Sequence, residues 1–248
     1  MLAKLFATVL ALVGPAPKDA PADLQLKPGD QIVAMGDSIT QGGGGATGYL
    51  TLIDLVLAKQ YPDLKLPKTI NAGISGQKAE DMVKRFEKDV VARKPAVVTI
   101  SVGINDVWHR LKNPHDEQVL ATYKANLTKM VDMAQAAGAK VIILSPTIIQ
   151  EDPEHEGNKR LPMYVAAGRE IAAEKKCAFV DLHGMFLTAL KQKPAEMGKK
   201  NWITGDGVHM NAQGNAMMAI GALRAMGVPD EKIAATEVPT PATKPAKK

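Results

Sequence analysis

Two short segments at opposite ends of the chain carry residues that could act together as a nucleophile and its base. Residues 36–40 read Gly-Asp-Ser-Ile-Thr and contain Ser38, and residues 206–209 read Asp-Gly-Val-His. A serine hydroxyl is a weak nucleophile at neutral pH unless an imidazole takes its proton and a carboxylate orients that imidazole. Because the Asp-x-x-His spacing lets one short turn carry both side chains, we predict that Asp206 reaches His209 Nδ1 and leaves Nε2 free for Ser38.

Each of these segments also has a simpler, structural interpretation. A serine beside glycine and aspartate is common in turns and helix caps, and Asp-Gly followed by histidine is common in surface turns. A short motif taken singly therefore favours the structural interpretation, and only a combination of motifs favours catalysis.

Two further segments could donate hydrogen bonds to a developing negative charge. Residues 71–76 read Asn-Ala-Gly-Ile-Ser-Gly and residues 102–106 read Val-Gly-Ile-Asn-Asp, each after an apolar run. A tetrahedral intermediate of acyl transfer needs about two or three fixed donors. Gly73 can bring its N–H close to a substrate because it has no Cβ, and Asn105 carries an amide NH₂. The alternatives are a turn glycine with positive φ at position 73 and a turn asparagine at position 105.

The four segments together resemble the SGNH hydrolase superfamily, also called GDSL esterases and lipases. The letters of that name match Ser38, Gly73, Asn105 and His209 in this order. The resemblance implies a Ser38–Asp206–His209 triad and an oxyanion hole made of the Ser38 and Gly73 N–H groups and the Asn105 side chain. Since Ser38 does not stand in a Gly-x-Ser-x-Gly elbow, the α/β-hydrolase fold is less favoured.

The pattern between the segments predicts an α/β fold with βα units around a parallel sheet of about five strands. Short runs of strand-forming residues predict strands at residues 31–35, 69–72, 97–102, 141–144 and 179–181. Apolar residues at helical spacing predict helices at residues 49–60, 78–93, 119–134, 165–176 and 212–226. The resemblance, which covers about residues 30–225, implies the flavodoxin-like three-layer α/β/α form. The carboxyl ends of parallel strands share one edge, so Ser38, Gly73 and Asn105 should lie along it, and the last loop should bring His209 there.

Two loops expected at the same edge are long enough to shape a substrate pocket. They span residues 107–118 and 147–162. Trp108 in the first loop could stack on a sugar or pack against an acyl chain, or it could only anchor its loop. We predict substrate contacts for Asp37 and Trp108. The acidic residues of the second loop lack a metal-ligand spacing and the chain has one cysteine, so we predict no metal and no cofactor.

The two ends of the chain differ in composition from its middle. Residues 1–22 combine an early lysine, an apolar run and small residues, which predicts a secretory signal peptide cleaved near residues 20–22. A buried N-terminal helix is the alternative. Residues 23–235 are then a single hydrolase domain, and the Pro- and Lys-rich residues 236–248 are a disordered tail. The predicted signal peptide implies an exported periplasmic or extracellular protein, and the apolar run is too short for a stable membrane anchor.

The charge and the motifs together limit the function. Much of the formal charge of +5 lies in the two ends of the chain. No nucleic-acid module occurs, so we expect no nucleic-acid partner. We predict a serine esterase for small-molecule or glycan esters, acting on short acyl groups such as the O-acetyl groups of carbohydrate. A lysophospholipase- or thioesterase-type acylhydrolase and a non-catalytic glycan-binding protein are the alternatives, and the oligomeric state stays open.

Overall fold

A parallel sheet of five strands forms the centre of the molecule, in the order β2-β1-β3-β4-β5. The computed structural model describes residues 4–17, 21 and 24–239. The strands are β1 (Ile32–Gly36), β2 (Ile70–Gly73), β3 (Val97–Ser101), β4 (Lys140–Leu144) and β5 (Ala178–Val180). All five predicted strands are present within about two residues of the expected bounds, and the predicted fold class is confirmed.

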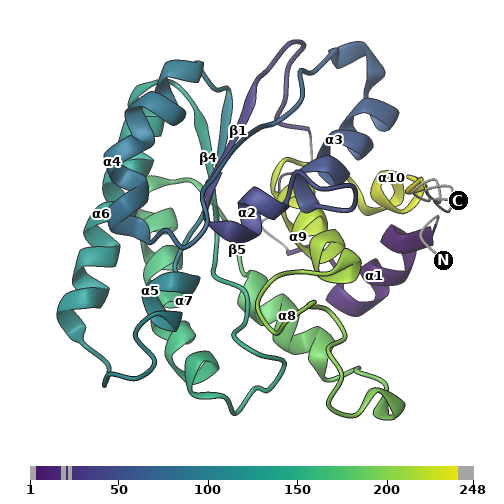
Figure 1. The fold of residues 1–248 in the computed structure, drawn as a ribbon. Coiled ribbons are helices and arrows are strands. Elements are labelled where there is room, and N and C mark those ends of the chain that lie inside the picture. Colours follow the sequence, from purple (N-terminus) through teal and green to yellow (C-terminus); the bar gives the residue numbers. More distant parts are fainter. Residues whose placement is uncertain (1–3, 18–20, 22–23, 240–248) are drawn as a thin grey trace, which may run out of the picture.

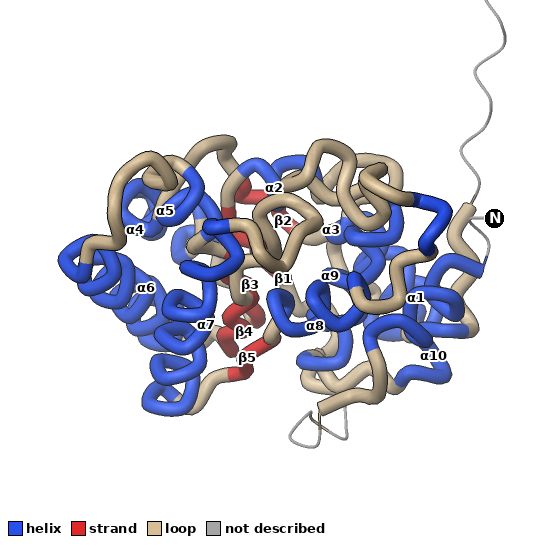
Figure 2. The backbone as a smooth tube through the Cα atoms, turned by 90° about the horizontal axis from the view of Figure 1, so that it is seen from below, coloured by secondary structure: helices blue, strands red, loops and turns tan. Residues whose placement is uncertain are grey.

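Helices cover both faces of the sheet, which makes three layers (Figure 1). One face carries α4 (Ala79–Asp89), α5 (Ile104–Trp108), α6 (Glu117–Ala136) and α7 (Glu156–Lys175). The other carries α1 (Leu5–Val13), α3 (Tyr49–Gln60), α8 (Leu182–Leu190), α9 (Ala212–Ala225) and α10 (Asp230–Ala234). Figure 2 shows the strands as a central band between the two groups of helices.

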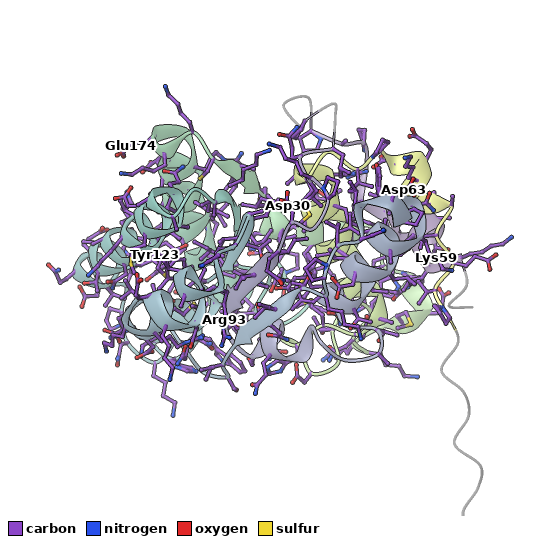
Figure 3. All side chains as sticks on the ribbon, turned by 90° about the horizontal axis from the view of Figure 1, so that it is seen from above. Asp30, Lys59, Asp63, Arg93, Tyr123 and Glu174 are labelled. Carbon is purple, nitrogen blue, oxygen red and sulfur yellow. The ribbon has the colours of Figure 1, made fainter. Side chains whose placement is uncertain are left out.

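Burial on both faces explains why the central strands are apolar along their whole length. Every residue of β1 and of β3 is buried, as expected for parallel strands covered by helices on each side. Tyr123 of α6 is 1% exposed and lies among the side chains that fill the space beside the sheet, whereas Lys59 and Glu174 lie at the periphery (Figure 3).

Several helical segments differ from the sequence-based prediction, including α8 and α10, which it does not contain. α7 begins at Glu156 instead of residue 165, so the second predicted loop is shorter, and Pro162 lies inside the helix. The polar first turns of α7 and its proline concealed the helical pattern, but the His155 side chain caps the helix by accepting from Gly157 N. The helices α2 (Ser38–Gly42) and α5 have five residues each, too few to show a hydrophobic period.

The two ends of the chain pack against the domain where the structure describes them. Phe6 and Val9 of α1 are fully buried, and α1 lies against α8, α9 and α10. Thr236 and Val238 are also buried, so the predicted start of a disordered tail at residue 236 is wrong. The rest of that tail, residues 240–248, and most of the predicted cleavage region, residues 20 and 22, lie outside the described residues. No helix in the described ranges has the length and apolar character needed to cross a bilayer.

Candidate active site

The predicted site residues follow three neighbouring strands. Ser38 comes two residues after β1, Gly73 is the last residue of β2, and Asn105 comes four residues after β3. β1 lies between β2 and β3 and runs parallel to both, so the three carboxyl ends meet at one edge. The topology therefore brings these residues to the edge where parallel α/β sheets bind ligands.

Ser38 is the first residue of α2, which starts directly at the end of β1. A Cβ at Gly36 would overlap the Thr40 side chain, so the abrupt change from strand to helix requires glycine there. The first residues of a helix have no intrahelical partner for their N–H groups. The Ser38 N–H therefore remains available at the same place as its hydroxyl.

The last loop brings His209 and Asp206 to Ser38 across most of the sequence. His209 Nε2 lies 2.9 Å from Ser38 Oγ, and His209 Nδ1 lies 2.7 Å from Asp206 Oδ2. The side chains of His209 and Asp206 are 42% and 56% exposed, so the site is open to solvent. This is the arrangement in which an imidazole can accept a proton from the serine hydroxyl while a carboxylate fixes its orientation.

The Asp206 carboxylate is held in its ionised form by three hydrogen bonds. Desolvation by partial burial alone would raise its pKa. The hydrogen bonds from the His209 ring and from the N–H groups of His209 and Val208 outweigh that effect and lower the pKa of Asp206 to about 2. A carboxylate that stays charged can favour the imidazolium form of its partner during proton transfer.

Asp37, for which a substrate contact is predicted, caps the helix that carries Ser38. Its side chain is buried, with 1% of the residue exposed, and its Oδ1 accepts a hydrogen bond from Ile39 N as the cap of α2. Burial raises the pKa of Asp37 to about 6. Asp37 therefore fixes the start of the helix that carries Ser38, and direct substrate binding by its side chain stays a prediction.

Gly73, predicted as an oxyanion donor, lies where β2 meets α2. Its N–H donates to Asn71 Oδ1 at 2.9 Å, so this donor is already used. Gly73 is not among the residues with positive φ. Instead, a Cβ at this position would overlap backbone atoms of α2 at Gln41, Thr40 and Asp37. The glycine is therefore needed for the close approach of β2 to α2, and in this structure its N–H donates to Asn71 instead of being free for a substrate oxygen.

Gly76 offers a backbone donor in the same loop, which the sequence analysis missed. Within the described part of the chain, the Gly76 N–H has no hydrogen-bond partner. Asn105 Nδ2 donates to the carbonyl of the next residue, Gln77, at 3.0 Å, so the Asn105 amide contacts the same turn of the chain. Gly76 has φ of +76°, a conformation that favours glycine.

Replacing Gly73 with alanine should destabilise the protein. Backbone atoms of α2 cannot move aside as a flexible side chain would, so we expect a loss of about 1–3 kcal/mol or more in the free energy of unfolding. Gly42→Ala is the matched control, because a Cβ at Gly42 meets nothing within 4 Å. Chemical denaturation of both variants measures the effect, and equal stability of the two would contradict the close packing of β2 on α2.

Trp108 lies beside the imidazole, where the sequence analysis expected a substrate contact. Its ring is 6.4 Å from the His209 ring in an edge-on arrangement, and it also lies 6.3 Å from the ring of His109. Asn105 and Trp108 are three residues apart on α5 and so share one face of that helix. This face of α5 is turned toward His209.

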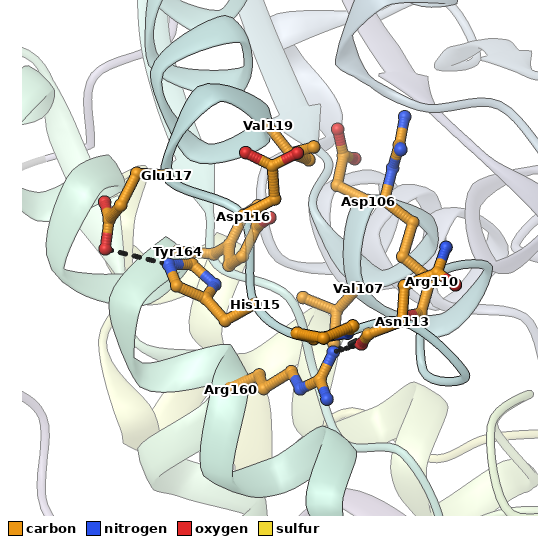
Figure 4. A pocket seen from close by; sticks show the side chains of 11 residues that line it. Asp106, Val107, Arg110, Asn113, His115, Asp116, Glu117, Val119, Arg160 and Tyr164 are labelled. Carbon is orange, nitrogen blue, oxygen red and sulfur yellow. Dashed lines mark hydrogen bonds and ion pairs between the residues drawn. The ribbon is translucent and has the colours of Figure 1, made fainter.

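A cavity of about 430 Å³ adjoins α5 at Asp106 and Val107 and continues along Arg110, in the loop after the helix (Figure 4). Polar and charged side chains from α6 and α7 complete its wall, including Glu117, Arg160 and Tyr164. Asp106 itself is 6% exposed and its carboxylate lies 3.4 Å from Ala79 N. Desolvation by burial raises the pKa of Asp106 to about 7.

The raised pKa of Asp106 predicts a pH-dependent effect of Asp106→Asn on stability. An aspartate in the unfolded chain loses its proton near pH 3.8, whereas folded Asp106 loses it near pH 7. The folded wild type therefore loses stability as the pH rises between these values, and the neutral amide does not. We expect Asp106→Asn to be more stable than wild type at pH 8, by on the order of 2–4 kcal/mol, and similar at pH 4. Denaturation at the two pH values measures this, and a pH-independent difference would contradict it.

The described residues contain no group of three His, Cys, Asp or Glu side chains that could hold a metal ion. Glu151, from the acidic loop considered in the sequence, is instead surrounded by hydrogen-bond donors of a distant loop. The sequence gives no signal for this contact, because the donors lie about fifty residues further along the chain.

Comparison with known proteins gives one family. Residues 34–217 match the model of the GDSL-like lipase/acylhydrolase family. An acetylxylan esterase from Geobacillus stearothermophilus is 31% identical over 219 residues, which cover 82% of this chain and 97% of the esterase. Esterase TesA from Pseudomonas aeruginosa is 28% identical, covering 72% of this chain and 78% of that protein. An uncharacterized lipoprotein from Bacillus subtilis, YqeF, is 29% identical over 58% of this chain and 57% of its own.

Solved structures agree with the sequence match. The crystal structure of the acetylxylan esterase from Geobacillus stearothermophilus has a TM-score of 0.72 and 28% identity, and the match covers 84% of this chain and 98% of that one. Three further structures of that esterase are described as catalytic mutants, in which a serine, an aspartate and a histidine are replaced by alanine. The family model spans well over half of the sequence and the fold agrees, so this chain belongs to the GDSL-like lipase/acylhydrolase family.

Proposed function

We propose that this protein is a serine esterase that hydrolyses carboxylic esters through Ser38, His209 and Asp206. The observation that carries the proposal is the 2.9 Å contact between His209 Nε2 and Ser38 Oγ, with Nδ1 of the same ring 2.7 Å from Asp206. The catalytic serine, aspartate and histidine replaced in the related acetylxylan esterase give independent support.

The reaction follows from this geometry in two steps. Ser38 Oγ attacks the ester carbonyl while His209 Nε2 accepts its proton, and the resulting imidazolium then protonates the leaving alcohol. A water molecule, deprotonated by the same nitrogen, attacks the acyl-enzyme, and Ser38 leaves with its proton restored. Asp206 holds the imidazole by Nδ1 throughout, and its lowered pKa keeps it ionised.

We assign the oxyanion hole to the N–H groups of Ser38 and Gly76 and the side-chain amide of Asn105. Asn105 Nδ2 carries two hydrogens and uses one of them on the Gln77 carbonyl, so the other remains for the substrate oxygen. Gly76 replaces Gly73 in this assignment, because the Gly73 N–H already donates to Asn71. Three donors from three loops of one sheet edge suit the charge that develops on a tetrahedral intermediate.

For the substrate we propose O-acetyl groups on carbohydrate, such as those of acetylated xylan. An acetylxylan esterase matches 82% of this chain, and the likeness includes nearly the whole of that protein. The large exposure of the His209 and Asp206 side chains suits an ester carried by a large polar molecule. Trp108 next to His209 gives an aromatic surface for a sugar ring.

Hydrolysis of p-nitrophenyl acetate, butyrate and octanoate, together with acetate release from acetylated xylo-oligosaccharides, tests this proposal. We expect turnover to fall as the acyl chain lengthens and acetate to be released from the oligosaccharides. Preference for octanoate would instead favour a lysophospholipase- or thioesterase-type acylhydrolase, which the likeness to TesA makes the second candidate. Binding of the oligosaccharides without any hydrolysis would favour the glycan-binding alternative.

We also propose that the protein is exported to the periplasm or the extracellular space. The N-terminal residues 1–22 have the composition of a signal peptide, and one relative is described as a lipoprotein. The apolar run of this segment is also the packed helix α1, so its removal would uncover apolar side chains of α8, α9 and α10. N-terminal sequencing of the protein from its native cell fractions distinguishes cleavage near residues 20–22 from retention of α1.

A further inference from the structure

Glu151 is a buried carboxylate outside the three proposed catalytic residues. Its side chain is 3% exposed. Four donors from consecutive residues surround it: Trp202 N at 2.7 Å, and Ile203 N, Thr204 N and Thr204 Oγ1 at 2.8 Å each. Burying a carboxylate costs free energy unless hydrogen bonds and charges replace the water that solvated it. The four donors around Glu151 largely replace that water.

The donors on Glu151 belong to the loop that carries Asp206 and His209. Thr204 Oγ1 donates to Glu151 and accepts from Gly207 N at 3.1 Å. The preceding residue, Gln150, donates its own N–H to the Gly207 carbonyl at 2.7 Å. Residues 150 and 151 therefore hold the loop on both sides of Asp206.

The other support of this loop comes from the buried side chains of Ile203 and Val208 and from hydrogen bonds that Asn211 donates to the carbonyls of residues 202 and 203. Apart from the single bridge between Thr204 and Met210, residues 202–210 form no regular secondary structure. The Asp206 and His209 side chains are too exposed for packing to fix them. Ser38, in contrast, lies on α2 at the end of the central strand. The distance between Ser38 and His209 therefore depends on what anchors the loop.

We propose that Glu151 is a positioning residue, whose carboxylate anchors residues 202–204 so that His209 Nε2 stays within hydrogen-bond distance of Ser38 Oγ. This inference rests on the proposed function, in which His209 is the base. A displacement of about 1 Å in a reacting group can slow catalysis by roughly 100-fold even when the change is remote from the chemistry.

The two oxygens of Glu151 have different partners, which makes the charge itself important. Oε1 accepts from Ile203 and Thr204, and Oε2 accepts from Trp202 N and also lies 3.4 Å from Lys193 Nζ. A glutamine at this position can replace only one of these oxygens, and its NH₂ would face the donors on the other side. Burial alone would raise the pKa of Glu151, but these hydrogen bonds lower it below its usual range, so the side chain remains charged.

Glu151→Gln and Thr204→Val test the proposal from the two sides of the same contact. We expect kcat for p-nitrophenyl acetate to fall by about 10- to 100-fold in each variant, with KM changed by less than about twofold. The rate at which a fluorophosphonate labels Ser38 should fall in parallel. Thr204→Ser, which keeps the hydroxyl and both of its hydrogen bonds, should restore kcat to near the wild-type value.

Asp230→Asn is the control for a loss of stability alone. Asp230 accepts two hydrogen bonds of 2.8 Å from the buried Arg224 and belongs to α10, which does not contribute to the site. This variant should melt at a lower temperature than wild type and keep its kcat.

The proposal is overturned if Glu151→Gln or Thr204→Val keeps wild-type kcat, or if Asp230→Asn loses as much activity as they do. If Glu151→Gln does not fold, the comparison of kcat between Thr204→Val and Thr204→Ser tests the proposal instead. Failure of the proposed function gives a different result, because Ser38→Ala would then retain the wild-type activity.

Discussion

Ser38→Ala should reduce kcat for p-nitrophenyl acetate by about 10⁵- to 10⁶-fold. The substitution removes the only hydroxyl that the structure places 2.9 Å from His209 Nε2, in the part of the chain that it describes, so no acyl-enzyme can form. The fold should be unaffected, because the Asp37 side chain caps α2 through Ile39 N and does not need the serine hydroxyl. Single-turnover and steady-state hydrolysis with active-site titration measure the effect.

Ser75→Ala is the matched control for this variant. Ser75 is exposed and lies in the loop after β2, and its N–H donates to the Gln41 side chain. Loss of its hydroxyl should leave kcat within a few-fold of wild type. If Ser38→Ala and Ser75→Ala were equally active, Ser38 would not be the nucleophile.

Asn105→Ala should have the second-largest effect, a loss of about 10²- to 10³-fold in kcat. The Asn105 amide acts mainly on the substrate carbonyl oxygen once that oxygen has become negative in the tetrahedral intermediate. The substitution should therefore change KM far less than kcat. Asn105 also donates to the Gln77 carbonyl, which lies next to Gly76, so the variant should loosen a second proposed donor. Steady-state kinetics at several substrate concentrations separate the two parameters.

Asn71→Ala, in strand β2 just before the loop that contains Gly76, provides the comparison. Asn71 Oδ1 accepts from Gly73 N, and its Nδ2 donates to the Thr40 and Gln41 carbonyls. In our assignment neither Asn71 nor the Gly73 N–H contacts the oxyanion, so this variant should lose stability and keep most of its kcat. Wild-type activity of Asn105→Ala would show that the negative oxygen is bound elsewhere.

The motifs of the sequence predicted the residues that meet at the sheet edge, because that meeting is a consequence of topology. Ser38 and Asn105 follow strands that run parallel and side by side, so their proximity needs no side-chain detail. The Asp-x-x-His spacing likewise predicted the contact between Asp206 and His209, since a short turn is enough to form it. Burial on both faces made the strands recognisable as continuous apolar runs.

The choice between glycines in the loop after β2 could not be made in the same way. Gly73 and Gly76 are three residues apart, and which N–H remains free depends on how the Asn71 side chain turns. The sequence also did not show that the Asp37 side chain, next to Ser38, is buried and caps α2. Neither the orientation of a side chain nor its local burial follows from a motif.

The contact between Glu151 and residues 202–204 could not be predicted from the sequence, for a different reason. Its donors begin at Trp202, fifty-one residues further along the chain, in a segment without regular structure. No periodicity or spacing relates two such segments, and only the packed fold brings them together. Glu151 in the sequence was one of several acidic residues in a loop, without a feature to distinguish it.

Labelling with a fluorophosphonate, followed by peptide mapping and assay of the remaining p-nitrophenyl acetate hydrolysis, tests the central claim most directly. Our account predicts a single adduct on the peptide that contains Ser38, with activity lost in proportion to labelling, and no adduct on that peptide in His209→Ala over the same time. A fully active labelled protein, or an adduct on another residue accompanied by loss of activity, would contradict the assignment of Ser38 as a nucleophile activated by His209.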